Sequence, residues 1–242
     1  MIDSIGRYQT GEVLKVKIEG YQLESTDTNC PYLENCIFTS DNLIINSIDE
    51  EGLETLLQTG YRHFGEYFFR PQCNSCKECR AIRVSVRDFN FSRSERRVLK
   101  NNKHFIVKFI DKPAPDMTYF SLYKDHKNRF KEKETESYDN WVSSFFSVQP
   151  FNKLLEVWDG KTLVAVTHLD VTSKIVSAVY CYWNESYASY SPGKFSILRG
   201  IELAIDTGVE FYYLGYYIKN NRHMAYKANY KPNEILEDGV WK

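Results

Sequence analysis

The sequence has few of the residues that interrupt regular structure. It contains only 7 prolines and 12 glycines among 242 residues, and no internal repeat or low-complexity tract is evident. Because proline and glycine mark most turns and linkers, their scarcity argues against a repeat array or a long flexible linker. A chain of this length can bury a full core as one large domain or as two small lobes packed together. We favour two lobes.

Long apolar runs are also absent. No stretch approaches the roughly 18 apolar residues of a membrane span, and 43% hydrophobic with 26% charged residues is an ordinary globular composition. Residues Met1–Arg7 lack a basic segment followed by an apolar stretch, so no export signal is indicated. We therefore expect a soluble, cytoplasmic protein with no membrane partner. In that reducing compartment its six cysteines should be free thiols or metal ligands rather than disulfides.

The net charge is small overall, but positive charge is concentrated in one segment. The net charge is −1, whereas residues 62–108 carry twelve Lys or Arg against four Asp or Glu. Such a segment can bind a polyanion, because each cation that contacts a phosphate releases counterions and adds affinity regardless of sequence. The alternative, with equal weight from charge alone, is a solvated face balanced by acidic residues elsewhere.

The hydrophobic pattern predicts two successive halves. The first has strands at 13–18, 61–70, 81–86 and 104–110, a helix at 47–60 and a short basic helix that opens on a capping box, Ser92-Arg93-Ser94-Glu95. Two prolines at 112–115 indicate a lobe boundary, so we divide the chain into residues 1–112 and 113–242. The second half has helices at 116–134, 137–146 and 194–207 and strands at 153–158, 163–171, 174–183 and 209–218. This order predicts an α/β (α+β) protein in which a small N-terminal lobe precedes a GNAT-like acyltransferase lobe with a mixed sheet.

A cysteine triplet is a candidate metal site. Cys73, Cys76 and Cys79 are spaced so that their thiolates can reach one ion. A tetrahedral site needs a fourth ligand, which Cys30 or Cys36 can supply, and an iron–sulfur cluster would use the same thiolates. A turn with reduced cysteines and no metal is an equally weighted alternative.

The segment Tyr190-Ser191-Pro192-Gly193-Lys194 lies between a predicted strand and a predicted helix. Backbone N–H groups and the positive end of the helix would face an anion there, so a phosphate fits. The turn lacks the glycine pattern by which acetyl-CoA enzymes of this fold hold pyrophosphate, which makes CoA the weaker donor. The bland alternative is an ordinary glycine-containing turn.

Three groups of segments together resemble the arginyl-tRNA:protein transferases and the bacterial aspartate/glutamate leucyltransferases. The first is Cys30-Pro31-Tyr32-Leu33, and the second runs from Gly60-Tyr61-Arg62 through Phe69-Arg70-Pro71 and the cysteines to Phe91–Arg97. The third and most specific comprises Tyr213-Leu214-Gly215-Tyr216-Tyr217-Ile218, Met224-Ala225-Tyr226-Lys227-Ala228 and Lys231-Pro232-Asn233-Glu234-Ile235-Leu236. The chain departs from the family at Pro192-Gly193-Lys194-Phe195-Ser196, where Leu-Gly-Thr-Tyr-Ser is typical.

The resemblance implies an enzyme of the N-degron pathway that moves an amino acid from aminoacyl-tRNA onto the N-terminus of a protein beginning with Asp or Glu. The short length resembles the bacterial, leucine-transferring branch, and arginine as the donor is the alternative. The reaction is aminolysis of an ester by an amine that is partly neutral near pH 7, so we expect positioning and oxyanion stabilisation rather than a catalytic triad. No cofactor should be required for the chemistry, although zinc or an iron–sulfur cluster can be bound by the cysteines.

We assign the site residues accordingly. The catalytic positions are Tyr190, Ser191, Lys194 and Tyr226. Selection of an acidic acceptor needs a cation, for which the candidates are Arg62, Arg70, Arg93, Arg96 and Lys227. Contacts to tRNA are assigned to Arg97, Lys100, Tyr216 and Lys231, and the metal ligands to Cys30, Cys73, Cys76 and Cys79.

Two rival functions follow from the same features. A non-enzymatic, metal-containing RNA-binding module would use the cysteines and the basic segment but leaves the second lobe unexplained. An acetyl-CoA-dependent N-acetyltransferase is permitted by the predicted fold but disfavoured by the turn at 190–194.

Overall fold

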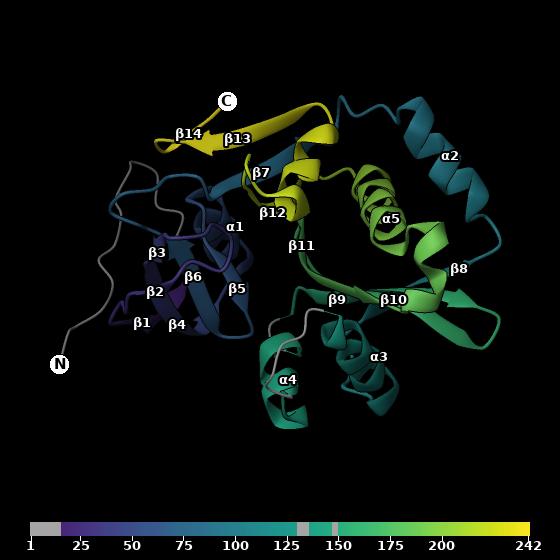
Figure 1. Ribbon diagram of the computed structural model, residues 1–242, viewed down its shortest axis with the longest axis horizontal. Coiled ribbons are helices and arrows are strands. Elements are labelled where there is room, and N and C mark those ends of the chain that lie inside the picture. Colours follow the sequence, from purple (N-terminus) through teal and green to yellow (C-terminus); the bar gives the residue numbers. More distant parts are fainter. Residues whose placement is uncertain (1–15, 130–135, 147–149) are drawn as a thin grey trace.

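A computed structural model describes residues 16–129, 136–146 and 150–242 and contains three sheets. The small sheet has the antiparallel order β1 (Ile18–Leu23), β4 (Ser40–Ile48), β6 (Tyr67–Pro71) and β5 (Arg62–Phe64), and α1 (Glu50–Gln58) follows β4. A short ribbon pairs β2 (Thr28–Asn29) with β3 (Ile37–Phe38). These elements form the left side of Figure 1.

The large sheet has eight strands. Their order is β14 (Val240–Trp241), β13 (Asn233–Glu237), β7 (Arg80–Ser85), β12 (Phe211–Tyr217), β11 (Ile175–Trp183), β10 (Thr162–Val171), β9 (Asn152–Asp159) and β8 (Ile106–Asp111). Among the pairings in the described residues, β11 with β12 is parallel and the others are antiparallel. The mixed α/β fold expected from the sequence is confirmed.

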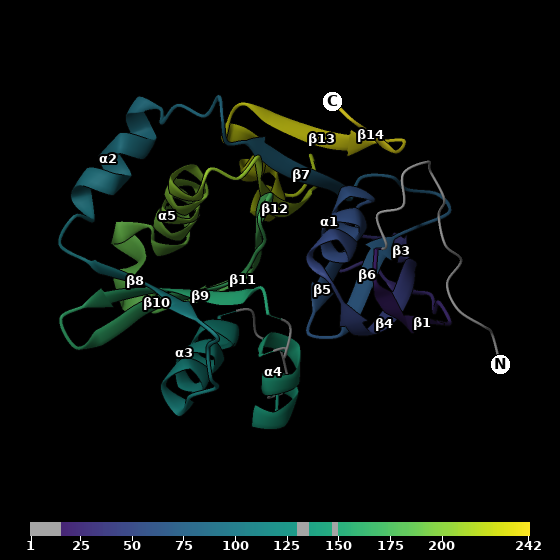
Figure 2. The same cartoon turned by 180° about the vertical axis from the view of Figure 1, so that it is seen from behind.

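Helices cover both faces of this sheet (Figures 1 and 2). One face carries α2 (Arg93–Asn101) and α5 (Pro192–Thr207), and the other carries α3 (Met117–Asn128) and α4 (Tyr138–Phe145). The short elements η1 (Glu185–Tyr190), α6 (Arg222–Ala225) and η2 (Tyr226–Asn229) connect the strands. Within the described residues, no helix combines the length and the apolar character needed to span a bilayer.

The small and large sheets share a core. Leu53, Leu57 and Phe68 of the small sheet and its helix form one buried cluster with Ile175 of β11 and Tyr213 of β12. Because this apolar contact reaches the point where β11 and β12 pair, the small sheet is fixed against the centre of the large one.

Local signals explain the helices. Ser92 and Glu95 form the predicted capping box of α2, with Ser92 Oγ accepting from the Glu95 amide at 3.3 Å and Glu95 Oε2 accepting from the Ser92 amide at 2.6 Å. Helix α5 ends at Gly208, whose positive φ of 71° suits a glycine. Within α5, a Cβ at Gly200 would lie 2.5 Å from the Tyr212 hydroxyl, so glycine permits close packing of α5 on β12.

Some local predictions need correction. The single strand predicted at 61–70 is the hairpin β5–β6, which turns at Gly65 with φ of 56°. The strand expected at 13–18 starts only at Ile18 within the described residues, and the end of the helix expected at 116–134 lies outside them. Strands β4 and β13 were not predicted. The lobe division at 112/113 stays a prediction; β7 and β8, which precede it, belong to the large sheet.

Candidate active site

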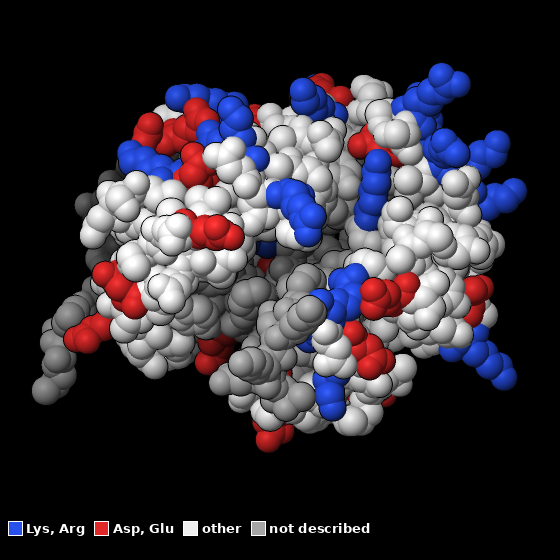
Figure 3. All heavy atoms as spheres, viewed as in Figure 1, with Lys and Arg blue, Asp and Glu red and all other residues white. Residues whose placement is uncertain are grey.

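The centre of the large sheet is opened by a divergence of two strands. β11 and β12 pair over three positions, Ile175–Ser177 with Phe211–Tyr213. Beyond them β11 follows β10 to Trp183, whereas β12 follows β7 to Tyr217. The face in Figure 3 is hollowed near its middle, between the small sheet and the large one. Where two strands separate, their facing N–H and C=O groups are left without strand partners and are available to hydrogen-bond a ligand.

Arg62 of β5 lies at the point where the strands diverge. Its Nη1 donates to Ser177 Oγ at 2.9 Å and its Nη2 donates to the carbonyl of Ala178, both on β11. The side chain is only 7% exposed. Burial lowers the pKa of Arg62, while the acidic groups of Tyr216 and Asp170 oppose that shift. The guanidinium nevertheless remains charged, because arginine is not deprotonated in proteins.

A second cation, Lys227 of η2, lies beside Arg62. A Cβ placed on Gly215 of β12 would be 3.4 Å from Lys227 Nζ and 3.7 Å from Arg62 Nε, so both cations lie on the same side of this glycine. Lys227 Nζ donates to the Tyr216 carbonyl at 2.8 Å. Burial first, and the neighbouring Arg62 second, lower the pKa of Lys227 to about 7. In the described part of the chain no carboxylate lies within ion-pair distance of Lys227.

A buried His–Asp pair supports this corner. His63 Nε2 lies 2.7 Å from Asp170 Oδ2, and His63 Nδ1 lies 3.0 Å from the Gly65 carbonyl. Asp170 Oδ1 has no hydrogen-bond partner among the described residues. Asp170 is the carboxylate that partly offsets the charge of Arg62. One carboxylate near two cations leaves the site with an excess of positive charge.

The predicted anion-binding turn joins η1 to α5. Ser191 has a left-handed backbone with φ of 55° and precedes Pro192, the first residue of the helix. Its side chain makes no cap hydrogen bond. Tyr190 is 39% exposed, and Lys194 lies in the first turn of α5. A 16-residue helix therefore presents its positive end at the position predicted from the sequence.

Tyr226 lies C-terminal to β12, after the short helix α6. It starts η2 directly before Lys227 and is 41% exposed. Burial of its hydroxyl first, and the nearby Cys181 second, raise the pKa of Tyr226 to about 12. The hydroxyl therefore keeps its proton at neutral pH and can donate a hydrogen bond.

The other cations predicted to bind the acceptor lie elsewhere. Arg93 and Arg96 are exposed on α2, together with Arg97 and Lys100. Figures 1 and 3 show α2 at the rim of the molecule, where Lys and Arg side chains gather. Among the described residues these four cations form no ion pair. The structure thus groups them with one another and not with Arg62.

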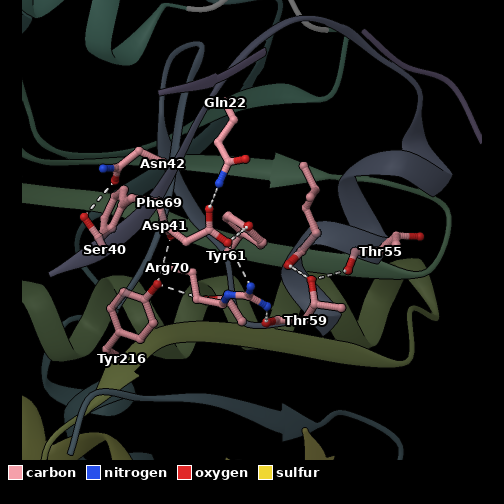
Figure 4. Close-up of polar contacts among 12 residues, drawn as sticks. Gln22, Ser40, Asp41, Asn42, Thr55, Thr59, Tyr61, Phe69, Arg70 and Tyr216 are labelled. Atoms are coloured by element: carbon pink, nitrogen blue, oxygen red, sulfur yellow. Dashed lines mark hydrogen bonds and ion pairs between the residues drawn. The ribbon is translucent and has the colours of Figure 1, made fainter. Parts of the chain in front are cut away.

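Arg70 of β6 is engaged within the small sheet (Figure 4). Its Nη2 donates to Asp41 Oδ2 at 2.9 Å, its Nη1 donates to the Thr59 carbonyl at 3.2 Å, and its guanidinium lies 4.6 Å from the centre of the Tyr61 ring. Tyr61 also donates to Asp41. These contacts form a network within the small sheet. An acceptor would have to displace one of them to form an ion pair with Arg70.

Two residues predicted to contact tRNA have opposite surroundings. Tyr216 is 5% exposed, and its hydroxyl donates to the carbonyls of Gly60 at 2.9 Å and Phe69 at 3.1 Å, which ties β12 to the small sheet (Figure 4). Lys231 is exposed in the turn before β13. A base could stack on Tyr216 only if its covered ring became accessible.

Four of the cysteines are neighbours. Burial first, and then Cys30, Cys73, Cys76 and Glu78, raise the pKa of the Cys79 thiol to about 12. Cys73 Sγ lies 3.4 Å from the Thr39 amide, from which it accepts. Within the described ranges, no three His, Cys, Asp or Glu side chains are arranged to hold a metal ion. The sulfur donors suit zinc or iron chemically, but they are gathered without the geometry of a ligand set.

Sequence reasoning missed His63, Asp170 and Ser177. The hydrogen bond from Arg62 to Ser177 spans 115 residues, and the His63–Asp170 contact spans 107. No local pattern carries such contacts. The one available signal is Asp170 itself, a charged residue near the end of a mostly apolar segment, β10, in which the residues from Leu163 to Leu169 are buried.

Comparison with known proteins matches both halves of the chain in order. Residues 28–97 match the family described as "Arginine-tRNA-protein transferase, N terminus", and residues 118–237 match "Arginine-tRNA-protein transferase, C terminus".

Whole-length relatives are also found. Proteins named aspartate/glutamate leucyltransferase are 34% identical in Campylobacter jejuni (serotype O:6, strain 81116), 31% in Helicobacter hepaticus and 29% in Acinetobacter baumannii strain AYE. The alignments cover 87%, 76% and 88% of this chain and 90%, 78% and 80% of the relatives. The solved structure of L-PGS from Bacillus licheniformis is 12% identical with a TM-score of 0.47, covering 74% of this chain and 54% of that one.

The matches extend over most of the chain and of its relatives, and they include the segments that supply Arg62, Gly215 and Lys227. This chain belongs to the aminoacyl-tRNA:protein transferase family of enzymes.

Proposed function

We propose that this enzyme transfers leucine from leucyl-tRNA to the N-terminal α-amine of proteins that begin with Asp or Glu, as a step of the N-degron pathway. The names of its relatives in Campylobacter, Helicobacter and Acinetobacter support leucine as the donor and Asp or Glu as the acceptor. Arginine, named by the family models, is the less favoured donor. The cytoplasm, where charged tRNA is made, is the proposed location.

The observation that carries the proposal is the pair of cations at the strand divergence, of which Arg62 is buried and Lys227 is half-buried. Arg62 and Lys227 lie together with one nearby carboxylate, Asp170. The side-chain carboxylate of an acceptor's first residue would neutralise this excess charge. An uncharged first residue would leave these two cations with Asp170 as the one nearby carboxylate, so the site favours an acidic first residue. Arg62 and Lys227 are therefore our acceptor-binding residues.

The chemistry is ester aminolysis. The α-amine of the acceptor attacks the carbonyl carbon of the aminoacyl ester, a C–N bond forms, and the C–O bond to the tRNA ribose breaks. The amine proton passes to the departing ribose oxygen. Holding both reactants in contact can supply most of the acceleration. Tyr226 is the proposed hydrogen-bond donor to the developing oxyanion, because it keeps its proton at neutral pH.

The donor tRNA is proposed to approach from the side of α5 and α2. The start of α5, with Tyr190, Ser191 and Lys194, would hold a phosphate of the acceptor end. Arg93, Arg96, Arg97 and Lys100 on α2 would contact backbone phosphates, and Lys231 remains a candidate for the same role. We therefore propose that Arg93 and Arg96, which the sequence analysis assigned to the acceptor, bind the tRNA instead.

No cofactor is proposed for the chemistry. If the protein binds zinc or an iron–sulfur cluster, the ligands are proposed to be Cys30, Cys73, Cys76 and Cys79, whose thiolates are suitable donors. Metal analysis of protein purified without chelator tests this assignment. Stoichiometric zinc or iron that is lost in Cys79→Ser supports it, and a metal content that is unchanged in Cys79→Ser contradicts it.

The transfer reaction itself is tested with purified protein. It is incubated with leucyl-tRNA or arginyl-tRNA and with peptides that begin with Asp, Glu or Ala, and the products are weighed by mass spectrometry. A gain of one leucine residue on the Asp and Glu peptides alone is expected. A gain of arginine instead would change the donor, and no gain with either tRNA would overturn the proposal.

A further inference from the structure

A cleft outside the strand divergence lies between the end of α2 and η1. Its volume is about 390 Å³, and its walls are Val98, Asn101, Asn102, Ser189, Tyr190 and Ser191. Ligand pockets are commonly about 300–1,000 Å³, so the space suffices for a small planar group. The cleft opens beside the start of α5 but includes none of the cations discussed above.

The walls carry no charged side chain, and apart from Val98 they are polar or aromatic. Asparagine amides and serine hydroxyls offer both hydrogen-bond donors and acceptors, and no Asp or Glu borders the cleft. Tyr190 adds a ring that is 39% exposed. That ring is held by edge contacts to His104 at 5.4 Å and Phe105 at 5.3 Å between ring centres. A fixed aromatic face with neutral hydrogen-bonding groups suits a nucleobase.

Asn102 gives a second, independent observation. It is 1% exposed, and its Nδ2 donates to the carbonyls of Val98 at 3.0 Å and Tyr190 at 2.9 Å, which ties α2 to η1. Its Oδ1 has no donor in the described part of the chain. A buried acceptor without a partner is unfavourable. Because this oxygen is covered, Asn102 serves to fix the two walls, and a bound base would form its hydrogen bonds with the exposed Asn101 and Ser189.

The position of the cleft fits one end of an RNA strand. Arg97 and Asn101 are four residues apart on α2, so they lie on the same face one helical turn apart. Arg93 and Lys100 are exposed on the same helix. A strand whose phosphates follow these cations would bring an unpaired base to the cleft. A peptide acceptor would gain nothing from this row of charge.

We propose that the cleft between α2 and η1 binds one unpaired nucleobase of the 3′ end of tRNA. The inference rests on the proposed function, because it takes aminoacyl-tRNA as the donor. The base would stack on Tyr190 and form hydrogen bonds with the asparagine and serine side chains. Phosphates on either side of it would contact α2 and the start of α5, which directs the ester toward the strand divergence.

The proposal is tested with two variants, each of which places a larger side chain in the cleft from one of its walls. Asn101→Trp blocks it from α2, Ser189→Phe blocks it from η1, and Ser121→Trp on an exposed position of α3 is the matched control. Affinity is measured by fluorescence anisotropy for two RNAs, intact tRNA and the same tRNA without its unpaired 3′ nucleotides. The expected result for both blocking variants is about tenfold weaker binding of intact tRNA and unchanged binding of the truncated tRNA, as for one lost stacked base.

Equal affinity of a folded blocking variant and the wild type for intact tRNA would overturn the proposal. A loss of the same size with truncated tRNA would also overturn it, since the effect would then come from the position of α2. Leucine transfer by the wild-type protein is measured in parallel. If the wild type transfers no leucine but the blocking variants bind intact tRNA about tenfold more weakly than the wild type, the proposed function is rejected and the nucleobase site remains supported.

Discussion

The molecule uses arginine and lysine in two contrasting ways. Arg62 and Lys227 are enclosed where the small sheet meets β11 and β12, whereas the cations of α2 stand exposed at the rim. The two groups are expected to have different roles although both are positively charged, because burial makes a cation selective for its binding partner. A buried cation strongly prefers a matching anion and penalises its absence. An exposed cation is screened within about 8 Å at physiological salt and adds affinity without selection.

This contrast suits an enzyme with two substrates, because each region can bind one of them. The enclosed pair can distinguish an acidic first residue from any other, which needs only one side chain of the acceptor. The exposed row can hold a long polyanion whose sequence is not read. The predictions below compare the same kinds of substitution in the two regions.

The largest effect is expected from Arg62→Met, with Arg97→Met as the same change on α2. Arg62→Met should lower kcat/KM for an Asp-initiated peptide by about a hundredfold, because the acidic side chain loses the opposing charge of the guanidinium. Arg97→Met should lower transfer only a few-fold and equally for Asp and Glu peptides. Initial rates with leucyl-tRNA give both values. Similar losses in the two variants would contradict the division of roles.

Arg62→Lys separates charge from shape. It retains a cation but cannot donate to Ser177, Ala178 and a carboxylate in the geometry of a guanidinium, so its activity should fall between those of Arg62→Met and the wild type. Thermal unfolding of all three proteins identifies a variant whose loss is due to misfolding.

The next effect is a pH dependence that belongs to Lys227. In the free enzyme its pKa is lowered to about 7 by burial and by Arg62. A bound carboxylate would raise that pKa, so the complex holds a proton that the free enzyme releases above pH 7. Affinity for an Asp-initiated peptide should therefore weaken as pH rises, by up to about tenfold per pH unit above 7.

Calorimetry without tRNA, between about pH 6 and pH 9, measures this dependence. Lys227→Arg is the control, because an arginine stays charged throughout and should remove most of the decline. The acceptor α-amine, with a pKa of about 7.7–8.0, titrates equally in both proteins. An identical decline in wild type and Lys227→Arg would show that Lys227 does not bind the carboxylate.

Local sequence signals predicted the helices better than the sheets. The capping box of α2 is confirmed, and the helix predicted at 47–60 is observed as α1, because each depends on a short stretch of chain. Strand β4 escaped prediction because Ser40 and Asn42, which read as solvent-facing, are buried and hydrogen-bonded to each other at 2.7 Å. The β5–β6 hairpin was hidden because the aromatic run Tyr67–Phe69 has no alternation.

For the site too, local motifs identified residues, but the spatial relations between those residues were not predicted. Arg62 and Lys227 were identified because motifs mark their positions, but nothing in the sequence placed them beside Gly215 or separated them from Arg93 and Arg96. That separation depends on strand pairings between distant segments, such as β7 with β12. The roles given to these residues remain predictions until the variants are measured.

A smaller effect is expected from the exposed row. Arg97→Ala and Lys100→Ala should each reduce the slope of log K against log salt for tRNA by about 1, with a few-fold loss of affinity at physiological salt. Lys161→Ala, in the exposed turn between β9 and β10, should leave the slope unchanged. Binding titrations over a salt series give these slopes. An unchanged slope in both α2 variants would remove this helix from the tRNA interface.

The smallest effect should come from loosening α2 without removing a cation. Glu95→Ala breaks the capping box, in which Glu95 Oε2 accepts from the Ser92 amide, and should lower the free energy of unfolding by about 1 kcal/mol. Lys103→Ala, at an exposed position beyond the end of α2, should change it by less than about 0.5 kcal/mol. If α2 serves only the tRNA, Glu95→Ala should weaken tRNA binding slightly and leave the KM for an Asp-initiated peptide unchanged. A raised KM for that peptide would show that the rim and the enclosed site are coupled.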